Sequence, residues 1–250
     1  MISKNKLKWV NSLQRKKIRD REDVFIAEGH KVVGDLLQGG YECVWKAEVR
    51  KSADGGELIT DEDLRRLSLL ETPQDVFAVL RQKHYDWDES VLETGLCLAL
   101  DGVQNPGNVG TILRIADWFG VEHVLCSHGC ADVYNPKTVQ ATMGALAHVK
   151  VHYVDLPAVL KSVREHSDVP VLGTFLDGKS IYEQESLPES VIKGIIVMGN
   201  EGNGISSEVG ELVTHRLLIP NYPEGRATTD SLNVAIATAV VCAELRRRQL

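Results

Sequence analysis

From residue 95 to the C-terminus, short apolar runs alternate with segments of helical periodicity. The six runs are LCLAL, HVLCS, VKVHYV, PVLGTF, IIVM and RLLIP, at 96–100, 123–127, 149–154, 170–175, 195–198 and 216–220. Strands that are apolar on both faces and alternate with helices are typical of a parallel sheet covered on each side. The pattern therefore predicts an α/β domain with a six-stranded parallel sheet, in which ligands bind beyond the carboxyl ends of the strands.

The first 81 residues carry a shorter, mixed pattern, which predicts a small α/β unit. Helices are expected up to about Leu13 and over 31–37 and 61–70, and strands are expected over 24–27, 41–49 and 76–80. The stretch HYDWDESVLET, at 84–94, has four acidic residues and little periodicity, as a linker would. We therefore expect domains at 1–83 and 95–250, joined by the linker at 84–94.

The composition is that of a protein without membrane segments or structural metal. No apolar run approaches the roughly 18 residues that span a membrane, and the start MISKNKLKWV lacks the apolar core of a signal peptide. We therefore expect a cytoplasmic protein. The five cysteines, at 43, 97, 126, 130 and 242, form no CxxC pair, so reduced thiols are expected rather than disulfides or a metal site.

Charge is distributed unevenly along the chain. The net charge is −7, but residues 1–21 hold eight Lys or Arg against the acid Asp20, which makes this segment +7 and the remainder −14. A basic face on an acidic protein indicates contact with a nucleic acid backbone, although a solvated helix end has the same composition. The candidate RNA contacts are Lys4, Lys6, Arg15, Lys16, Lys17, Arg19 and Arg21.

The first stretch that could carry chemistry is LDGVQNPGNVGTILRIADWFGV, at 100–121. Asn105-Pro106-Gly107 is a turn, Asn108 is a natural N-cap, and an apolar helical stripe follows at Ile112, Ile115, Ala116 and Phe119. Arg114 points about 150° away from the centre of that stripe, so it is free to face a substrate or partner. Alternatively, Arg114 pairs with Asp117 or stacks on Trp118 along the helix surface.

The second stretch is GIIVMGNEGNGIS, at 194–206, where a buried strand ends in a glycine-rich loop. Bare backbone lets a ligand approach closely, and Glu201 could orient it. The loop lacks the Lys and Ser/Thr of a phosphate-binding P-loop, and its glycine spacing does not fit the dinucleotide pattern. A nucleoside triphosphate or NAD is therefore not expected, although an ordinary strand-to-helix loop is an open alternative.

The third stretch is LLIPNYPEGRATTDSLNVAIATAVVCAELRRR, at 217–248. Ser231 or Asp230 is expected to cap a helix that is apolar on nearly every side over 234–243. Such a helix must be covered all round, within the core or in a dimer interface. The closing arginines at 246–248 suit a helix C-terminus at least as well as they suit RNA binding.

Together, the three stretches resemble the three ordered motifs of the SpoU family of SPOUT methyltransferases, which methylate RNA ribose 2′-hydroxyls with S-adenosylmethionine. NPGNVGTILRIADWFGV resembles motif one, IIVMGNEGNGIS motif two, and IP followed by SLNVAIATA motif three. The N-terminal KLKWVNSLQRKKIRDREDVFIAEGHKVV resembles the L30e-like substrate-binding domain common in that family. The resemblance implies a C-terminal domain with a deep trefoil knot, an RNA-binding N-terminal domain and a homodimer formed through the methyltransferase domain.

The resemblance also implies roles for particular residues. Arg114 would activate the ribose hydroxyl, positioned by Asn108, Glu201, Ser231 and Asn233. Because a guanidinium has a pKa above about 12, we expect Arg114 to stabilise the developing alkoxide rather than to act as a base, with the proton leaving to a phosphate or to water. The cofactor S-adenosyl-L-methionine would lie bent in the knot against Thr174, Phe175, Leu176, Gly199, Asn200, Gly202, Ile219 and Leu232.

The chain departs from the family pattern at several positions. Its loop at 221–230 is longer than usual, which leaves open which of Gly225, Arg226 and Asp230 approaches the cofactor. Asn105 stands where aspartate is common, and Ala235 where serine is frequent. The expected function is methylation of a ribose 2′-hydroxyl, in ribosomal RNA rather than tRNA. The alternatives are a tRNA 2′-O-methyltransferase and a non-catalytic RNA-binding or ribosome-assembly protein on the same fold.

Overall fold

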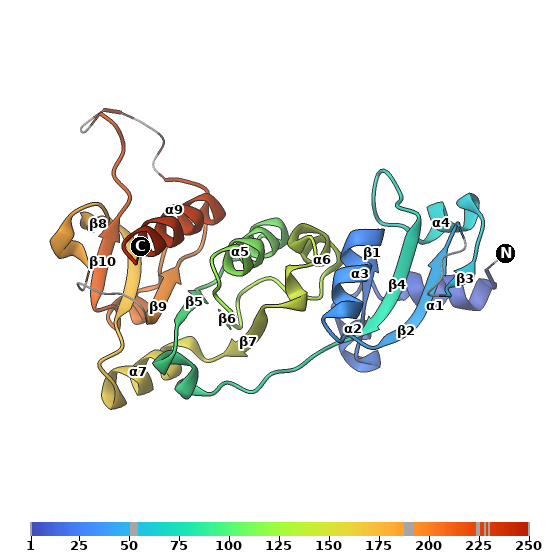
Figure 1. The fold of residues 1–250 in the computed structure, drawn as a ribbon, viewed down its shortest axis with the longest axis horizontal. Coiled ribbons are helices and arrows are strands. Elements are labelled where there is room, and N and C mark those ends of the chain that lie inside the picture. Colours follow the sequence, from blue (N-terminus) through green and yellow to red (C-terminus); the bar gives the residue numbers. More distant parts are fainter. Residues whose placement is uncertain are drawn as a thin grey trace. The chain divides into compact units, whose positions relative to one another are not determined.

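The computed structural model describes residues 2–50, 55–187, 193–223, 226–227, 229 and 231–249. The chain divides into two compact units, and Figure 1 shows the elements of each. The first unit is Met1–His84 with Asp132–His148, and the second is Tyr85–Ala131 with Val149–Leu250.

The first unit is a mixed four-stranded sheet with helices. Its elements are α1 (Lys4–Ser12), α2 (Lys16–Glu22), β1 (Val24–Glu28), α3 (His30–Gln38), β2 (Cys43–Glu48), β3 (Glu57–Leu58), α4 (Asp61–Leu67), β4 (Val76–Arg81), α6 (Pro136–Thr142) and the 3₁₀ helix η2 (Ala145–Ala147). The strand order is β1-β4-β2-β3, and only β2 and β3 run parallel. Side chains from α1, α4 and the sheet share one core, which includes Val10, Leu64 and Phe77.

The segment Asp132–His148 belongs to this first unit although it follows β6 in the chain. The Tyr41 hydroxyl donates to the Leu146 carbonyl (3.2 Å), and the rings of Phe25 and Tyr134 pack with centroids 4.7 Å apart. The contiguous boundaries expected from sequence did not anticipate this excursion, because the partners of the segment lie about 100 residues earlier in the chain.

The second unit contains the predicted six-stranded parallel sheet. Its strands are β5 (Leu96–Leu100), β6 (His123–Ser127), β7 (Lys150–Val154), β8 (Val171–Ser180), β9 (Gly194–Met198) and β10 (His215–Leu218). Their order is β10-β8-β9-β5-β6-β7, and every pairing is parallel. The prediction of six parallel strands is confirmed, because long apolar runs fit strands that are buried on both faces.

Helices cover both faces of this sheet, as Figure 1 shows. The helical elements are α5 (Pro106–Trp118), α7 (Leu156–His166), α8 (Ser207–Gly210), α9 (Val234–Arg247) and the 3₁₀ helices η1 (Glu89–Glu93) and η3 (Gln184–Ser186). Helices α7 and α8 pack with Cys97, Ala99 and their neighbours on one face. Helices α5 and α9 lie side by side on the other face.

Two expectations about helix starts need correction. The N-cap of α5 is Asn105, whose carboxamide oxygen accepts from the N–H groups of Gly107 and Asn108, so Asn108 lies inside the helix. The N-cap of α9 is Asn233 rather than Ser231, and Asp230, like Gly225, lies outside the described residues. In both helices an asparagine that satisfies two free N–H groups decides the start.

The sequence left open whether α9 is covered by the core or by a dimer partner, and its own chain does not cover it all round. The side chain of Ile236 is 54% exposed, Ala243 is exposed and Val240 is half-buried. These positions follow the i, i+4, i+7 spacing of one helix face. An apolar stripe on α9 therefore remains open in the single chain.

Candidate functional site

The candidate site lies where the loops after β5 and β9 meet. These strands are paired in the centre of the sheet, with Leu100 opposite Met198. The loop that leads into α5 and the glycine loop therefore leave the sheet next to each other, both at carboxyl ends. This is the position at which ligands bind in parallel sheets.

The glycine loop is a tight turn that leaves no room for a side chain at its start. Asn200 and Gly204 exchange both backbone hydrogen bonds, at 2.8 and 2.9 Å. A Cβ atom at Gly199 would lie 2.2 Å from the Gly204 carbonyl carbon and 2.3 Å from the Ile205 nitrogen. Because such distances are far below van der Waals contact, this position requires glycine.

Asn200 fixes the loop to its neighbour. Its carboxamide oxygen accepts from the N–H groups of Gly202 (2.9 Å) and Asn203 (3.0 Å), and its nitrogen donates to the Gly102 carbonyl (2.7 Å). The Asp101 carboxylate also accepts from the Ser206 N–H at 2.7 Å. Asp101 and Gly102 were missed from sequence. The only signal was an Asp-Gly pair directly after a predicted strand, opposite the glycine loop.

Three predicted site residues form a chain of hydrogen bonds. Asn108 donates to the Glu201 carboxylate (2.9 Å), and Asn233 donates to the Asn108 oxygen (3.0 Å). The oxygen of Asn233 accepts from the Ala235 and Ile236 N–H groups at the start of α9. One residue from each of the three sequence motifs therefore meets at a single point.

Glu201 is held as a carboxylate. Burial acts to raise its pKa, but the hydrogen bonds from Asn108 and from the N–H groups of Asn105 and Gln104 outweigh this effect and lower the pKa below its usual value. A carboxylate with a lowered pKa is a good hydrogen-bond acceptor and a poor base near neutral pH. The hydrogen bond from Asn108 indicates that Glu201 orients the Asn108 amide.

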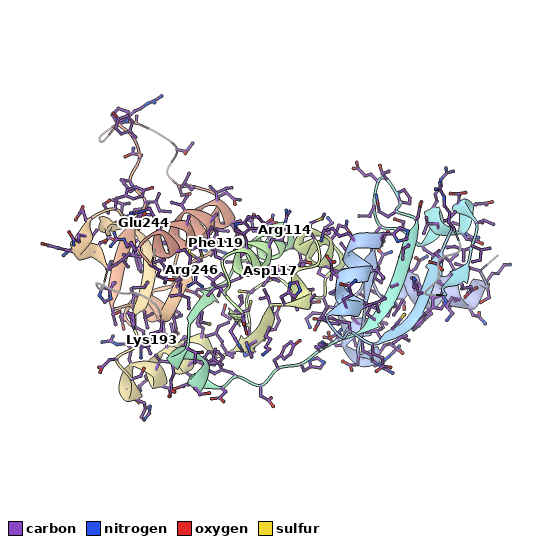
Figure 2. The ribbon with its side chains drawn as sticks, in the orientation of Figure 1. Arg114, Asp117, Phe119, Lys193, Glu244 and Arg246 are labelled. Carbon is purple, nitrogen blue, oxygen red and sulfur yellow. The ribbon has the colours of Figure 1, made fainter. Side chains whose placement is uncertain are left out.

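Arg114 lies on α5, six positions beyond Asn108, and is exposed. Figure 2 labels it together with Asp117 on the same helix. Its guanidinium forms no hydrogen bond or ion pair with any described residue. The alternative in which Asp117 neutralises it therefore finds no support, and its charge is available to an anion.

The predicted cofactor contacts outside the glycine loop come from β8, from the residue after β10 and from the segment before α9. Leu176 is 75% exposed and Leu232 is 50% exposed, while Ile219 and Thr174 are half-buried. One face of the Phe175 ring is already covered, because the Arg216 guanidinium lies 3.5 Å from the ring centroid. Ser231 is exposed, two residues before the cap of α9.

The predicted RNA contacts in the first unit have different surroundings. Lys4, Arg15, Lys16, Lys17 and Arg21 are exposed, and two of them form ion pairs, Lys16 with Asp20 and Arg21 with Glu22. The ammonium of Lys6 lies over the rings of Trp9 (5.0 Å) and Trp45 (5.1 Å).

Arg19 does not fit the expectation of an RNA contact. Its side chain is 1% exposed, its guanidinium donates to the carbonyls of Leu13 and Gln14, and it pairs with Asp132. A guanidinium with these internal partners stabilises the first unit and cannot reach a phosphate at the surface. Sequence position alone could not distinguish it from its exposed neighbours.

The C-terminal arginines have structural partners. Arg246 donates to the carbonyls of Phe119 (2.8 Å) and Gly120 (3.1 Å) at the end of α5, and Figure 2 labels Arg246 and Phe119. Arg247 and Arg248 both pair with Glu244, whose pKa falls to about 2, chiefly through the Arg247 hydrogen bond. Of the two alternatives left by the sequence, these contacts favour helix capping.

No helix among the described residues has both the length and the apolar content to cross a bilayer. No group of three or more His, Cys, Asp or Glu side chains in this part of the chain is arranged to hold a metal ion.

The chain is similar to known proteins over almost its whole length. Residues 95–243 match the model of the SpoU rRNA Methylase family, and residues 4–78 match that of the MRM3-like substrate binding domain. The 23S rRNA (guanosine(2553)-2′-O)-methyltransferase RlmP of Bacillus subtilis is 32% identical over 249 residues, which cover 96% of each chain.

Solved structures agree with these matches. One from Porphyromonas gingivalis, assigned to the TrmH family of RNA methyltransferases, is 42% identical, with a TM-score of 0.85 over 99% of each chain. An AdoMet-bound rRNA methyltransferase from Sinorhizobium meliloti is 26% identical, with a TM-score of 0.84 over 100% of this chain and 97% of that one.

Proposed function

Since the chain belongs to the SpoU rRNA methylase family, we propose that it methylates a ribose 2′-hydroxyl of ribosomal RNA with S-adenosyl-L-methionine. The observation that carries this proposal is the hydrogen-bonded chain Asn233–Asn108–Glu201, which joins all three motifs. Arg114, on the same helix as Asn108, is exposed and has no ion-pair partner among the described residues. The relatives named above include a ribosomal 2′-O-methyltransferase, which favours rRNA over tRNA.

The methyl transfer requires the protein to position the reacting groups and to stabilise the developing charge. A hydroxyl oxygen must approach a methyl group in line while it loses its proton. Arg114 stabilises the negative charge that develops on that oxygen and holds a neighbouring phosphate. Glu201, already ionised, keeps Asn108 in the rotamer that accepts the hydrogen bond from the Asn233 amide. The proton of the ribose hydroxyl leaves to the phosphate or to water.

The residues around the glycine loop fit the proposed cofactor. Leu176 and Leu232 present exposed apolar surface of the kind that an adenine or a methionine chain covers. When bound, S-adenosylmethionine supplies the electrophilic methyl group. The chain contributes main-chain contacts at Gly199, Ile219 and Leu232 and excludes water from the reacting atoms.

The predicted trefoil knot remains part of the proposal. The edge strand β10 lies next to β8, yet the helix that follows it, α9, packs on α5 beside the central strands. The described chain therefore has β10 at the edge of the sheet and α9 beside its centre. This arrangement is compatible with the threading of the C-terminal segment that the family motifs imply.

We also propose a homodimer formed through the second unit, with the first unit holding the RNA. The open apolar stripe of α9, with Ile236 at 54% exposure, supports the dimer, and the exposed basic residues near the N-terminus support RNA contact. A cytoplasmic location, which the sequence predicted, suits a protein whose substrate is ribosomal RNA.

Two measurements on the full chain test the function. In a calorimetric titration, S-adenosylmethionine should bind and NADPH should not. In a transfer assay with rRNA, followed by reverse-transcription mapping, a single 2′-O-methyl site should appear. Binding of the cofactor without any methyl transfer would favour the non-catalytic alternative.

The variant Arg114→Ala tests the mechanism. Turnover should fall at least about 100-fold, because one preorganised charge at the developing alkoxide is lost. The affinity for S-adenosylmethionine should stay within about threefold, because the guanidinium is not assigned to the cofactor. Lys161→Ala, an exposed cation on α7, is the matched control and should leave turnover unchanged. Transfer that persists in Arg114→Ala would contradict the assigned role.

A further inference from the structure

Strand β8 leaves the regular ladder of the sheet for part of its length. Its pairing with β9 ends at Gly173. On its other side, Gly173 stands opposite Arg216 of β10. The next residue of β10, Leu217, already stands opposite Lys179. Residues 174–178, the β8 bulge, therefore stand opposite a single peptide step of β10, and bulges commonly re-aim side chains next to active sites.

Two side chains of the β8 bulge contact Arg216. The guanidinium carbon lies 3.5 Å from the centroid of the Phe175 ring, and Nη2 donates to the Asp177 carboxylate at 2.5 Å. This hydrogen bond lowers the pKa of Asp177 below its usual value. The ring of Phe175 also packs on Gly173, where a Cβ atom would lie 2.7 Å from the ring carbon Cε2. The ring is therefore held from two directions.

The end of the β8 bulge is held by close contact between backbones. A Cβ atom at Gly178 would lie 2.5 Å from the carbonyl carbon of Leu217 and 2.8 Å from that of Arg216. Because these distances exclude a side chain, the bulge rejoins the sheet in contact with the peptide step that it bypasses. Arg216 therefore borders the bulge with its main chain and covers it with its side chain.

The other side of the β8 bulge faces the candidate site. Side chains alternate along an extended chain, so Thr174 and Leu176 lie on the side opposite Phe175. The Thr174 hydroxyl lies 4.0 Å from the sulfur of Met198, the last residue of β9 before the glycine loop. Leu176, two positions further along, is 75% exposed. One side of the bulge is thus held by the protein, while the opposite side is open to a ligand.

We propose that Arg216 is a positioning residue for S-adenosylmethionine. By holding Phe175 and Asp177, it keeps the β8 bulge in the shape that the cofactor meets at Leu176. Because binding then requires no ordering of this segment, less of the binding free energy is lost. Arg216 acts through the bulge, since its side-chain contacts lie on the side turned away from the cofactor. This inference rests on the proposed function.

The variant Arg216→Ala tests this role in the full chain. The affinity for S-adenosylmethionine, measured by calorimetry, should fall about tenfold, because the released bulge must be ordered on binding. In the transfer assay, KM for the cofactor should rise by the same factor, while kcat and KM for rRNA stay within about twofold. The melting temperature should stay within about 2 °C, since exposed ion pairs contribute little to stability. Unchanged cofactor affinity, or a rise in KM for rRNA alone, would overturn the proposal.

Further variants separate the stacked contact from the charge. Arg216→Lys can still pair with Asp177 but loses the planar group over the Phe175 ring, so it should recover only part of the affinity. Arg164→Ala is the matched control, because Arg164 is an exposed arginine of the same unit that donates to the Glu211 carbonyl. It should bind the cofactor as the natural chain does. An equal loss of affinity in Arg164→Ala and Arg216→Ala would overturn the assignment to Arg216.

Limited proteolysis with chymotrypsin tests the hold on the β8 bulge without any ligand. Cleavage after Phe175 or Leu176 should be at least about tenfold faster in Arg216→Ala than in the natural chain or in Arg164→Ala, because a released bulge opens more often. Equal cleavage rates would show that Arg216 does not hold the bulge and would overturn the proposal. If the natural chain does not bind S-adenosylmethionine, the proposed function fails and the cofactor role with it, whereas the cleavage rates still decide whether Arg216 holds the bulge.

Discussion

Single residues at the glycine loop determine how tightly the loop closes on itself. Gly199 follows β9 directly, and its α-carbon faces the backbone of Gly204 and Ile205. Gly199→Ala should lower the affinity for S-adenosylmethionine at least about tenfold, because a methyl group 2.2 Å from a backbone carbon forces the loop apart. Calorimetry measures the affinity, and thermal unfolding shows whether the domain remains folded.

The matched control for this substitution is Gly95→Ala. Gly95 precedes β5 in the same unit, and a Cβ atom there would meet nothing within 4 Å. Its variant should bind the cofactor as the natural chain does. Equal affinity in the Gly199 and Gly95 variants would show that the loop tolerates the methyl group and that its tight closure is unimportant.

At the scale of elements, α5 and α9 form a parallel pair that is tied at both ends. Asn233 bonds to Asn108 at the N-terminal ends, and Arg246 bonds to the Phe119 and Gly120 carbonyls at the C-terminal end of α5. Arg246→Ala should therefore destabilise the second unit by about 1–2 kcal/mol, because a charged donor is removed from two helix-end carbonyls. The melting temperature should fall by a few degrees.

Circular dichroism during heating checks this expectation. Arg65→Ala provides the control, since Arg65 is an exposed arginine on the short helix α4 and should be replaceable at no cost. If Arg246→Ala has the same melting temperature as the natural chain, the bonds of Arg246 to α5 do not stabilise the unit. RNA binding then becomes the better explanation for this arginine.

At the scale of the whole molecule, the exposed face of α9 predicts self-association. Ile236→Glu should convert the proposed dimer to a monomer, because a charge in the centre of an apolar interface is left without a partner. Sedimentation velocity measures the mass. Leu58→Glu is the control, since Leu58 is 60% exposed but lies on β3 of the first unit. A monomeric natural chain, or a dimeric Ile236→Glu variant, would contradict this interface.

The dimer also allows a test of which subunit uses Arg114. The resemblance places this arginine near the cofactor of the partner subunit. Co-assembly of Arg114→Ala with Gly199→Ala subunits in equal amounts, assayed at a cofactor concentration too low to fill the Gly199→Ala sites, should then restore about a quarter of the natural activity, because half the dimers carry one intact composite site. If Arg114 serves the site of its own subunit, the mixture should stay inactive.

By itself, the sequence determined the local features of this protein. The apolar runs marked all six strands of the parallel sheet, most clearly the central strands β5 and β9, which are buried on both faces. The ordered motifs at the strand ends resembled those of the family and predicted Asn108, Glu201 and Asn233 as site residues. In such sheets, ligands bind at the carboxyl ends of the strands.

Only the tertiary structure decided which of these residues touch. Asn108 lies 93 residues from Glu201 and 125 from Asn233, and no local pattern reports a hydrogen bond over that distance. The same holds for Arg19, which is buried against Asp132 although its neighbours are solvated, and for the segment Asp132–His148, which packs with the first unit. Periodicity reports which face of an element is buried, but its partners depend on how the whole chain packs.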